Sequence, residues 1–131
     1  LTGEIYYGIK EVGSFKIIQN SIFRLAITPK DMFISGIRII SSFSKEFQGN
    51  QRHIQSFREP KILEVESSLR LIWIAENKAD IYFQIGTTSE WEICGAHAVI
   101  KYAGGHILLE GYSTELSYNK ENSLNQNFVV H

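Results

Sequence analysis

The N-terminal part of the chain is rich in β-branched and aromatic residues, which favour strands. Two such runs, Glu4 to Lys10 and Ser14 to Ile18, are separated by the short turn Glu11-Val12-Gly13 and predict a hairpin. A third strand is predicted over Phe23 to Thr28, where Pro29 ends it. We therefore expect the chain to open with three consecutive strands.

Apolar residues recur at helical spacing further along the chain. The three predicted helices are Met32 to Phe47, Ser68 to Glu76 and Trp91 to Ala103. Asp31 is the expected N-cap of the first helix, and Gly49-Asn50 follows its end. The second helix is almost entirely apolar, so we expect it to be buried. Gly104-Gly105 ends the third.

The remaining extended segments are short and are interspersed with these helices. They are Ile54 to Phe57, Lys61 to Val65, Ala79 to Ile85, His106 to Glu110 and Phe128 to Val130. This order predicts a mixed α/β fold in which helices cover a sheet. The 131 residues suffice for one core. We expect residues 1–20 to be a remnant hairpin of a preceding domain and residues 21–131 to form a C-terminal α/β domain.

Composition and charge exclude several classes of function. The net charge is −1, so no overall attraction to nucleic acid or to an anionic membrane is expected. A single cysteine, Cys94, excludes an internal disulfide and a zinc site of several thiolates. No apolar run reaches the roughly 18 residues of a membrane span, and no signal peptide is visible. We expect a cytoplasmic protein. Because the chain begins at Leu1 inside a predicted strand, we expect it to be part of something longer.

One segment carries a specific resemblance. Residues Trp91 to Gly105 read Trp-Glu, then small residues, then aliphatic residues, then Ala-Gly-Gly. This order resembles the C-terminal signature of the inositol monophosphatase superfamily, except that Glu92 stands where the family has Asp. Two further segments resemble the family as a whole: Gly3 to Phe15 its first-sheet hairpin, and Asp80 to Thr88 the strand and loop before the Trp-Asp element. Three others resemble its 3′(2′),5′-bisphosphate nucleotidase branch: Ser67 to Arg70, Glu115 to Lys120 and Leu124 to Phe128. The resemblance implies the C-terminal half of an αβαβα sandwich, preceded by a hairpin of its first sheet.

The resemblance also implies a chemistry. Family members use Mg²⁺ to bind a substrate phosphate and activate a water. Most of the ligands come from a Glu-Glu pair and an Asp-Pro-x-Asp-Gly-Thr motif in the N-terminal half, and this chain contains neither. Glu92 is the one candidate metal ligand here, and no catalytic residue is expected in this half. The chain alone is expected to be inactive, and its Mg²⁺ would need ligands from the missing N-terminal half.

The implied substrate is a phosphorylated small molecule or nucleotide, foremost 3′-phosphoadenosine 5′-phosphate. Ser67, Ser68 and Gln84 fall at positions where the family binds its substrate. Glu66 departs from the family, which has Gly there, and it brings negative charge toward a phosphate.

Local structure offers a simpler explanation for most of these residues. Ser89-Glu90-Trp91-Glu92 has the pattern of a helix capping box, with Glu92 at its third helical position. Ser67 and Ser68 suit a helix start, and Gln84 could be an ordinary strand residue. We expect a structural His97, a buried and inert Cys94, core positions for Trp73 and Trp91, and solvated Arg70 and Lys101. His53, His106 and His131 show no metal-ligand spacing.

Two functions of different classes fit these observations. The chain could be the C-terminal part of a phosphatase that acts on a bisphosphate nucleotide or on an inositol or sugar phosphate. Alternatively, it could be a non-catalytic, degenerate half that serves as a dimerisation or binding module, to which Glu66, Gln84 and Glu92 each point. Its partner would be a second copy or the missing N-terminal half. An unrelated α/β domain is the third possibility, and the ordered, chain-long resemblance argues against it.

Overall fold

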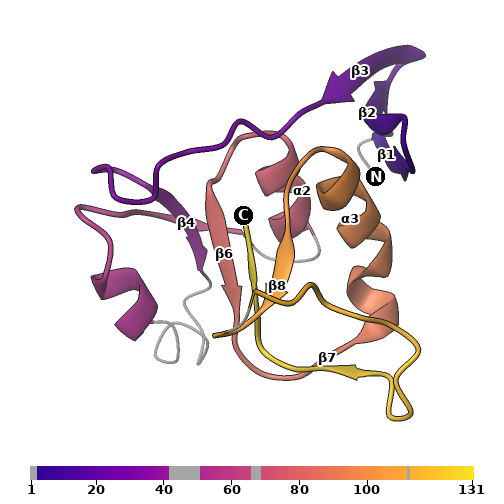
Figure 1. Cartoon of the computed structure of the whole chain (residues 1–131). Coiled ribbons are helices and arrows are strands. Elements are labelled where there is room, and N and C mark those ends of the chain that lie inside the picture. Colours follow the sequence, from indigo (N-terminus) through magenta and orange to yellow (C-terminus); the bar gives the residue numbers. More distant parts are fainter. Residues whose placement is uncertain (1–2, 42–50, 66–68, 112) are drawn as a thin grey trace.

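The computed structural model describes residues 3–41, 51–65, 69–111 and 113–131 and arranges them in layers of sheets and helices (Figure 1). The elements are β1 (Ile5–Ile9), β2 (Gly13–Ile18), β3 (Ser21–Leu25), β4 (Arg38–Ser41), β5 (Lys61–Glu64), α2 (Leu69–Ala75), β6 (Ile81–Gln84), β7 (Thr88–Ser89), α3 (Glu90–Tyr102), β8 (Ile107–Leu109), β9 (Leu124–Asn125) and β10 (Phe128–Val130). Residues 51–55 are also helical. The described strands form three sheets, of order β1-β2-β3, β5-β4-β6-β10-β8 and β7-β9. The predicted mixed α/β class is confirmed.

The first sheet is an antiparallel meander. The predicted turn between β1 and β2 is present, and Gly13 has a φ of 133° there. The second turn, Gln19-Asn20, has positive φ at both residues, which matches the twist of a tight hairpin. The third predicted strand therefore pairs with the hairpin in one sheet, along the register from Ser14 opposite Leu25 to Ile18 opposite Ser21.

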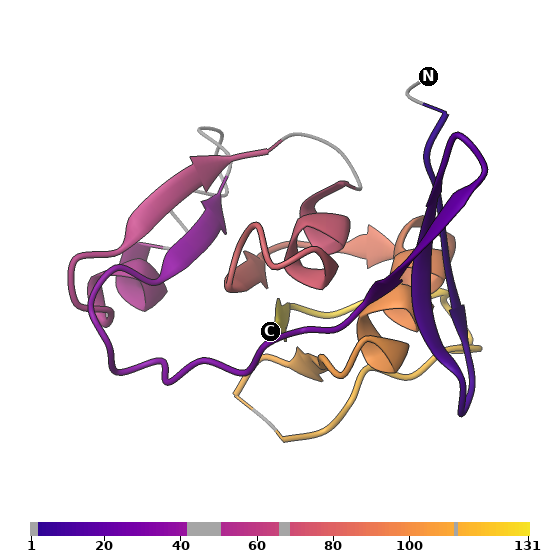
Figure 2. The same ribbon diagram turned by 90° about the horizontal axis from the view of Figure 1, so that it is seen from above.

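This first sheet packs directly on helix α3, as Figure 2 shows from above. A Cβ atom added at Gly8 would lie 2.3 Å from the carbonyl oxygen of Ala98, so the strand and the helix can approach this closely only at glycine. The hydroxyl of Ser14 donates a hydrogen bond of 2.6 Å to the carbonyl oxygen of Val99. Both contacts fix the position of the C-terminal half of α3.

The five-stranded sheet is mixed and has helices on both faces. β4 pairs in parallel with β5 and β6, whereas β10 is antiparallel to β6 and β8. Alternate residues of each strand point to opposite cores. Tyr82 and Phe128 join the core formed with α2 and α3, whereas Ile81 and Phe83 join a smaller core with Ile54 of the helical segment 51–55. Strands covered on both faces are largely apolar, as Ile81 to Phe83 of β6 are.

Helix α2 is short and deeply buried, as its composition predicts. Leu71, Ile72, Ile74 and Ala75 all lie in the larger core. The predicted segments around β5, β6, α3, β8 and β10 are likewise confirmed, with ends that differ by one or two residues. The larger core between α2, α3 and the five-stranded sheet is therefore the part of the fold that the hydrophobic pattern predicts best.

The predicted helix over Met32 to Phe47 is wrong wherever the structure describes it. Residues 38–41 form strand β4, whose Ile39 and Ile40 are fully buried on opposite faces of the sheet. A strand buried on both faces is a continuous apolar run, and short runs of this kind fit helical spacing equally well. Asp31 caps a turn instead of a helix, because its Oδ1 accepts the amide of Phe33 at 2.9 Å. Residues 42–50 lie outside the described residues.

The second error is the extended segment predicted over Ile54 to Phe57. Residues 51–55 are helical, and Ile54 is buried in the smaller core against Phe83. One buried apolar residue in a polar stretch carries too little periodicity to distinguish a helical turn from a strand.

A buried carboxylate joins the starts of β4 and β6. Asp80 accepts hydrogen bonds from the backbone and guanidinium of Arg38, at 2.8 and 2.6 Å, and an ion pair of 2.8 Å links it to Lys30. Burial opposes ionisation of Asp80, but the hydrogen bonds from Arg38 and Lys30 outweigh it and lower the pKa to about 2. Asp80 therefore has a structural role, in which its ionised carboxylate links the start of β4 to the start of β6.

Candidate functional site at the start of helix α3

The N-terminus of α3 presents the candidate metal ligand. Ser89 is the N-cap, with extended backbone angles, and Glu92 occupies the third helical position. The backbone amide of Ser89 donates a hydrogen bond of 2.6 Å to Oε2 of Glu92, which confirms the capping box. Glu92 is nevertheless exposed to solvent. Its second carboxylate oxygen makes no hydrogen bond to a described residue, so the cap leaves one oxygen available to a cation.

Gln84 ends strand β6 and turns inward. Its side chain is buried, accepts a hydrogen bond from the hydroxyl of Tyr82, and has its amide nitrogen 3.4 and 3.5 Å from the carbonyl oxygens of Ile85 and Gly86. Arg70 of α2 reaches the same hydroxyl at 3.0 Å. Gln84 thus belongs to an internal polar network with Tyr82 and Arg70, and its described contacts fit a structural strand residue.

The structure brings some predicted site residues to one end of the molecule. Gln84 ends β6 and Glu92 lies in the first turn of α3, with only residues 85–91 between them (Figure 1). Ser67 and Ser68 precede α2, but they lie outside the described residues, as does Glu66. No hydrogen bond between described residues joins Gln84 to Glu92.

The expectation that Trp91 and Cys94 are buried is wrong. Trp91 is 71% exposed and Cys94 is an exposed free thiol. Trp91 lies with Glu92 and Gly95 on an exposed side of α3. Cys94 lies one turn before His97 and lines a shallow pocket with His97 and Tyr118. An aromatic residue near a helix start is usually buried, but the helical pattern does not say which face of the helix meets the core.

His97 has the structural role that the sequence predicts. It is 4% exposed, its Nδ1 lies 2.7 Å from the hydroxyl of Tyr118, and its Nε2 lies 3.4 Å from Glu115. Burial lowers the pKa of His97, although the neighbouring Glu115 opposes that shift. The lowered pKa favours the neutral imidazole, which lies between helix α3 and the segment that carries Glu115 and Tyr118.

Lys101 is a solvated helix charge, as expected, with its side chain 47% exposed, whereas Arg70 is less solvated than expected. Arg70 donates to the carbonyl oxygen of Val65 and to Tyr82, and its guanidinium lies 5.6 Å from the centre of the Tyr82 ring. Lys101 pairs with Glu115 at 2.6 Å. Trp73 packs against the larger core, as predicted.

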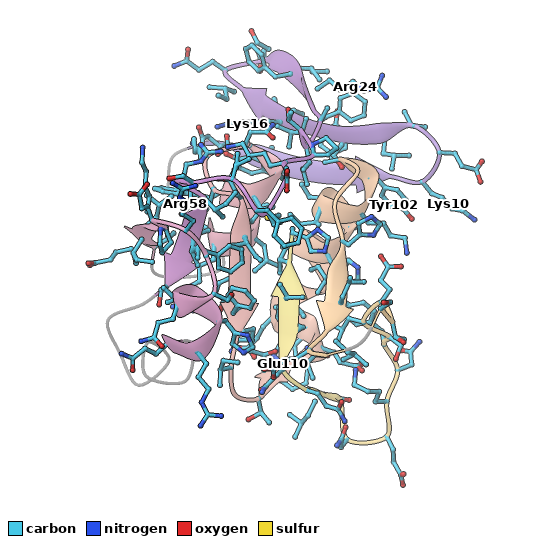
Figure 3. All side chains as sticks on the ribbon, turned by 60° about the vertical axis from the view of Figure 1, so that its left-hand side comes forward. Lys10, Lys16, Arg24, Arg58, Tyr102 and Glu110 are labelled. Atoms are coloured by element: carbon cyan, nitrogen blue, oxygen red, sulfur yellow. The ribbon has the colours of Figure 1, made fainter. Side chains whose placement is uncertain are left out.

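Two polar clusters escaped the sequence analysis. The carboxylate of Glu90, in the first turn of α3, pairs with Lys120 at 2.5 Å. His53 lies 2.8 Å from Oε1 of Glu110, and its ring stacks on Phe83 at 4.8 Å; Figure 3 labels Glu110. Each pair joins residues far apart in the chain, so no local motif announces it. Locally, the sequence shows only that Glu90 is an acidic residue at the first helical position, which the capping-box pattern Ser89 to Glu92 also explains.

The described residues do not form a complete metal site. No group of three or more His, Cys, Asp or Glu side chains among them could hold an ion. Mg²⁺ prefers several hard oxygen ligands in octahedral geometry, and one free oxygen of Glu92 is a single such ligand. The arrangement is therefore at most one part of a larger centre. Among the described helices, none is both long and apolar enough to cross a membrane.

Comparisons with known proteins extend the resemblance to almost the whole chain. The chain is 32% identical over 79 residues to the 3′(2′),5′-bisphosphate nucleotidase CysQ of Salmonella typhimurium, which covers 60% of this chain and 32% of that protein. It is 39% identical over 61 residues to an uncharacterized Rhizobium leguminosarum protein, covering 46% of this chain and 62% of that one. The chain thus spans about a third of the length of the nucleotidase it matches.

Solved structures show the same fold. CysQ from Bacteroides thetaiotaomicron matches with a TM-score of 0.81 at 23% identity, over 97% of this chain and 53% of that one. SuhB of Mycobacterium tuberculosis matches with a TM-score of 0.66 at 17% identity, over 97% of this chain and 47% of that one. Residues 1–127 match the family model described as the inositol monophosphatase family. This chain belongs to the inositol monophosphatase family, whose members are magnesium-dependent phosphomonoesterases.

Proposed function

We propose that this chain is the C-terminal part of a magnesium-dependent phosphatase that hydrolyses a phosphate monoester, foremost 3′-phosphoadenosine 5′-phosphate. The observation that carries the proposal is the exposed Glu92 carboxylate at the start of α3, within a chain whose residues 1–127 match the family. The choice of substrate is supported by the 32% identity to a 3′(2′),5′-bisphosphate nucleotidase. Phosphate esters of inositol or a sugar are the second substrate class.

In this proposal Glu92 contributes one oxygen ligand to the metal centre. Ser67, Ser68 and Gln84 contact the substrate, with Gln84 also bonded to Tyr82. The described residues lack the remaining metal ligands, so these come from the N-terminal half of a longer protein. The protein is assigned to the cytoplasm, where its exposed thiol Cys94 would stay reduced.

A second candidate function is a non-catalytic module that binds another chain. It is favoured by the outer face of the first sheet, which points away from α3. Ile5, Ile9 and Ile22 on this face are 58%, 45% and 63% exposed, and Tyr7 stacks on Phe15 beside them. Apolar sheet faces of this kind are normally covered by another layer or by a partner. In the first proposal the rest of the longer protein covers this face, and in the second a separate chain covers it.

Two observations decide between these functions. The coding sequence upstream of Leu1 should contain an in-frame Asp-Pro-x-Asp-Gly-Thr motif if the protein is a phosphatase. The longer protein should then release phosphate from 3′-phosphoadenosine 5′-phosphate in the presence of Mg²⁺, and the 131-residue chain should not. Equal turnover by the short chain would disprove the division of the site. A start codon at or near Leu1, with a stable dimer in sedimentation and no turnover, would favour the non-catalytic module.

A further inference from the structure

One face of helix α3 beside its apolar core is covered by a single segment that makes many polar contacts. Glu90, His97 and Lys101 are spaced by seven and four residues, which places them on one face of the helix. The segment 115–125 meets both ends of this face, through Glu115 at Lys101 and through Asn119 at Glu90, and its chain passes the N-terminal end of α3 in Figure 1. We refer to residues 115–125 as the strap.

The strap contacts α3 through a row of charged and polar groups, while its Leu116 joins the larger core. At the C-terminal end of the helix, Lys101 pairs with Glu115 at 2.6 Å. In the middle, the buried His97 lies 2.7 Å from the hydroxyl of Tyr118. At the N-terminus, Glu90 reaches the strap near Lys120. Hydrogen bonds are directional, so these contacts fix rotation and axial position of the helix more narrowly than apolar packing does.

Glu90 is the most heavily bonded of these residues. Its carboxylate accepts the backbone amides of Asn119 and Lys120, at 3.0 and 3.1 Å, and the ammonium of Lys120 at 2.5 Å. Its side chain is only 12% exposed, and the hydrogen bond from Lys120 leads the contacts that lower its pKa. Its own backbone amide donates to the carbonyl oxygen of Ser123 at 3.0 Å. Glu90 thus holds the strap from both its backbone and its side chain.

Lys120 completes the connection on the strap side. Besides Glu90, its ammonium donates to the carbonyl oxygen of Ser117 at 2.6 Å and to Oδ1 of Asn125 at 3.1 Å. Asn125 is 1% exposed, pairs with Thr88 in the sheet of β7 and β9, and donates to the Thr88 hydroxyl at 3.3 Å. The residues immediately before α3 are therefore tied to the same ammonium that binds Glu90.

We propose that the strap positions the N-terminus of α3, with Glu90 as its positioning residue, and that the Glu90–Lys120 pair sets where the Glu92 carboxylate points. Glu92 follows Glu90 by two residues and faces solvent while Glu90 faces the strap. The two carboxylates thus have separate tasks: Glu90 holds the helix start inward, which leaves Glu92 outward. The importance of this arrangement for catalysis rests on the proposed role of Glu92.

The test compares variants of the 131-residue chain by amide hydrogen exchange and NMR. In Glu90→Gln, the amides of Ser89, Glu90, Asn119 and Lys120 should exchange about tenfold faster, because a charge-assisted anchor is lost. The side-chain ¹³C shift of the Glu92 carboxyl should move as well. Core amides such as that of Ala103 should keep their wild-type rates. Glu121→Gln, which removes the same charge from an exposed strap residue, is the matched control and should change none of these signals.

Faster exchange confined to Asn119 and Lys120, with unchanged Ser89 and Glu92 signals, would overturn the proposal, because the strap would then move without the helix start. If Glu90→Gln does not fold, Lys120→Met provides the same readouts while it retains the carboxylate and its two backbone donors. None of these signals depends on Mg²⁺ or on turnover. The exchange and NMR results would therefore stand even if the protein proved not to be a phosphatase. Likewise, phosphatase activity would not by itself show that Glu90 positions the helix start.

Discussion

Besides its contact with the first sheet, helix α3 has two covered faces that are built in opposite ways. Toward α2 and the five-stranded sheet it buries Ile93, Val99 and Ile100 in the larger core. Toward the strap it presents Glu90, His97 and Lys101, each with a specific polar partner. Apolar packing holds the helix in the molecule through buried area, and the polar face adds directional contacts that restrict its placement. A helix that presents a metal-binding carboxylate at its exposed end benefits from both kinds of contact.

The largest effect is expected from the apolar face. Ile100 is fully buried, so Ile100→Ala removes apolar contacts and leaves a cavity. The free energy of unfolding should fall by about 2–5 kcal/mol, measured by denaturant titration. Trp91→Ala on the uncovered side of the same helix is the control and should change it by less than about 0.5 kcal/mol. Equal losses of unfolding free energy in the two variants would contradict the buried position of Ile100 and the exposed position of Trp91.

The contact with the first sheet should respond next. Gly8→Ala places a Cβ against the carbonyl oxygen of Ala98, and backbone atoms cannot give way easily. We expect a loss of about 1–3 kcal/mol. The matched control is Gly95→Ala, in a helical position with nothing within 4 Å, which should stabilise by about 0.5–1 kcal/mol. The opposite signs can be read from two melting curves, and a stabilising Gly8→Ala would refute the close approach of β1 to α3.

The polar face of α3 should make the free energy of unfolding depend on pH. Because burial lowers the pKa of His97 below its usual value of 6.5, the unfolded chain binds a proton more readily than the folded chain. The free energy of unfolding should therefore fall as the pH drops below about 6.5, and the fall should continue to the lower folded pKa. His131, whose pKa burial also lowers, adds a fall of the same sign.

His97→Gln isolates the contribution of His97. Gln can still bond the Tyr118 hydroxyl but does not titrate, so the variant should lose about 1–3 kcal/mol at pH 7 and a smaller amount at pH 5.5. Chemical denaturation at the two pH values measures the difference. The same loss at both values would show that His97 does not carry the pH dependence.

The smallest effect on stability is expected at the uncovered end of the helix. Glu92→Ala removes the carboxylate that accepts the Ser89 amide, and should cost about 0.5–1 kcal/mol. Glu121→Ala removes an equivalent charge outside the helix and should have almost no effect in the same thermal melts. A loss above about 3 kcal/mol would mean that Glu92 is part of the structural framework and not a surface cap.

The same two faces separate what sequence can predict from what it cannot. The apolar face of α3 and the capping box at Ser89 are local patterns, and both were predicted. Strand β4 was missed because an apolar run buried on both faces fits two kinds of element. The Glu90–Lys120 pair was missed because it joins residues thirty positions apart, and no periodicity encodes such a contact.

The site itself was only partly predictable. Glu92 and Gln84 were found through the resemblance of the segments around them, and the structure places Gln84 at the end of β6 and Glu92 in the first turn of α3. Which side of α3 stays uncovered depends on tertiary packing, so the burial expected for Trp91 and Cys94 was wrong. The roles of Glu92, Gln84, Ser67 and Ser68 in metal or substrate binding remain predictions.

The most direct test of the metal site is the Mg²⁺ dependence of phosphate release by the longer protein with three residues at position 92. Glu92→Gln should raise the Mg²⁺ concentration for half-maximal release from 3′-phosphoadenosine 5′-phosphate by at least about tenfold, because an anionic ligand is lost. Glu92→Asp, which installs the residue that the family signature has, should match or improve on the natural residue. Equal Mg²⁺ dependence in all three proteins would contradict the account and would leave Glu92 as a helix cap alone.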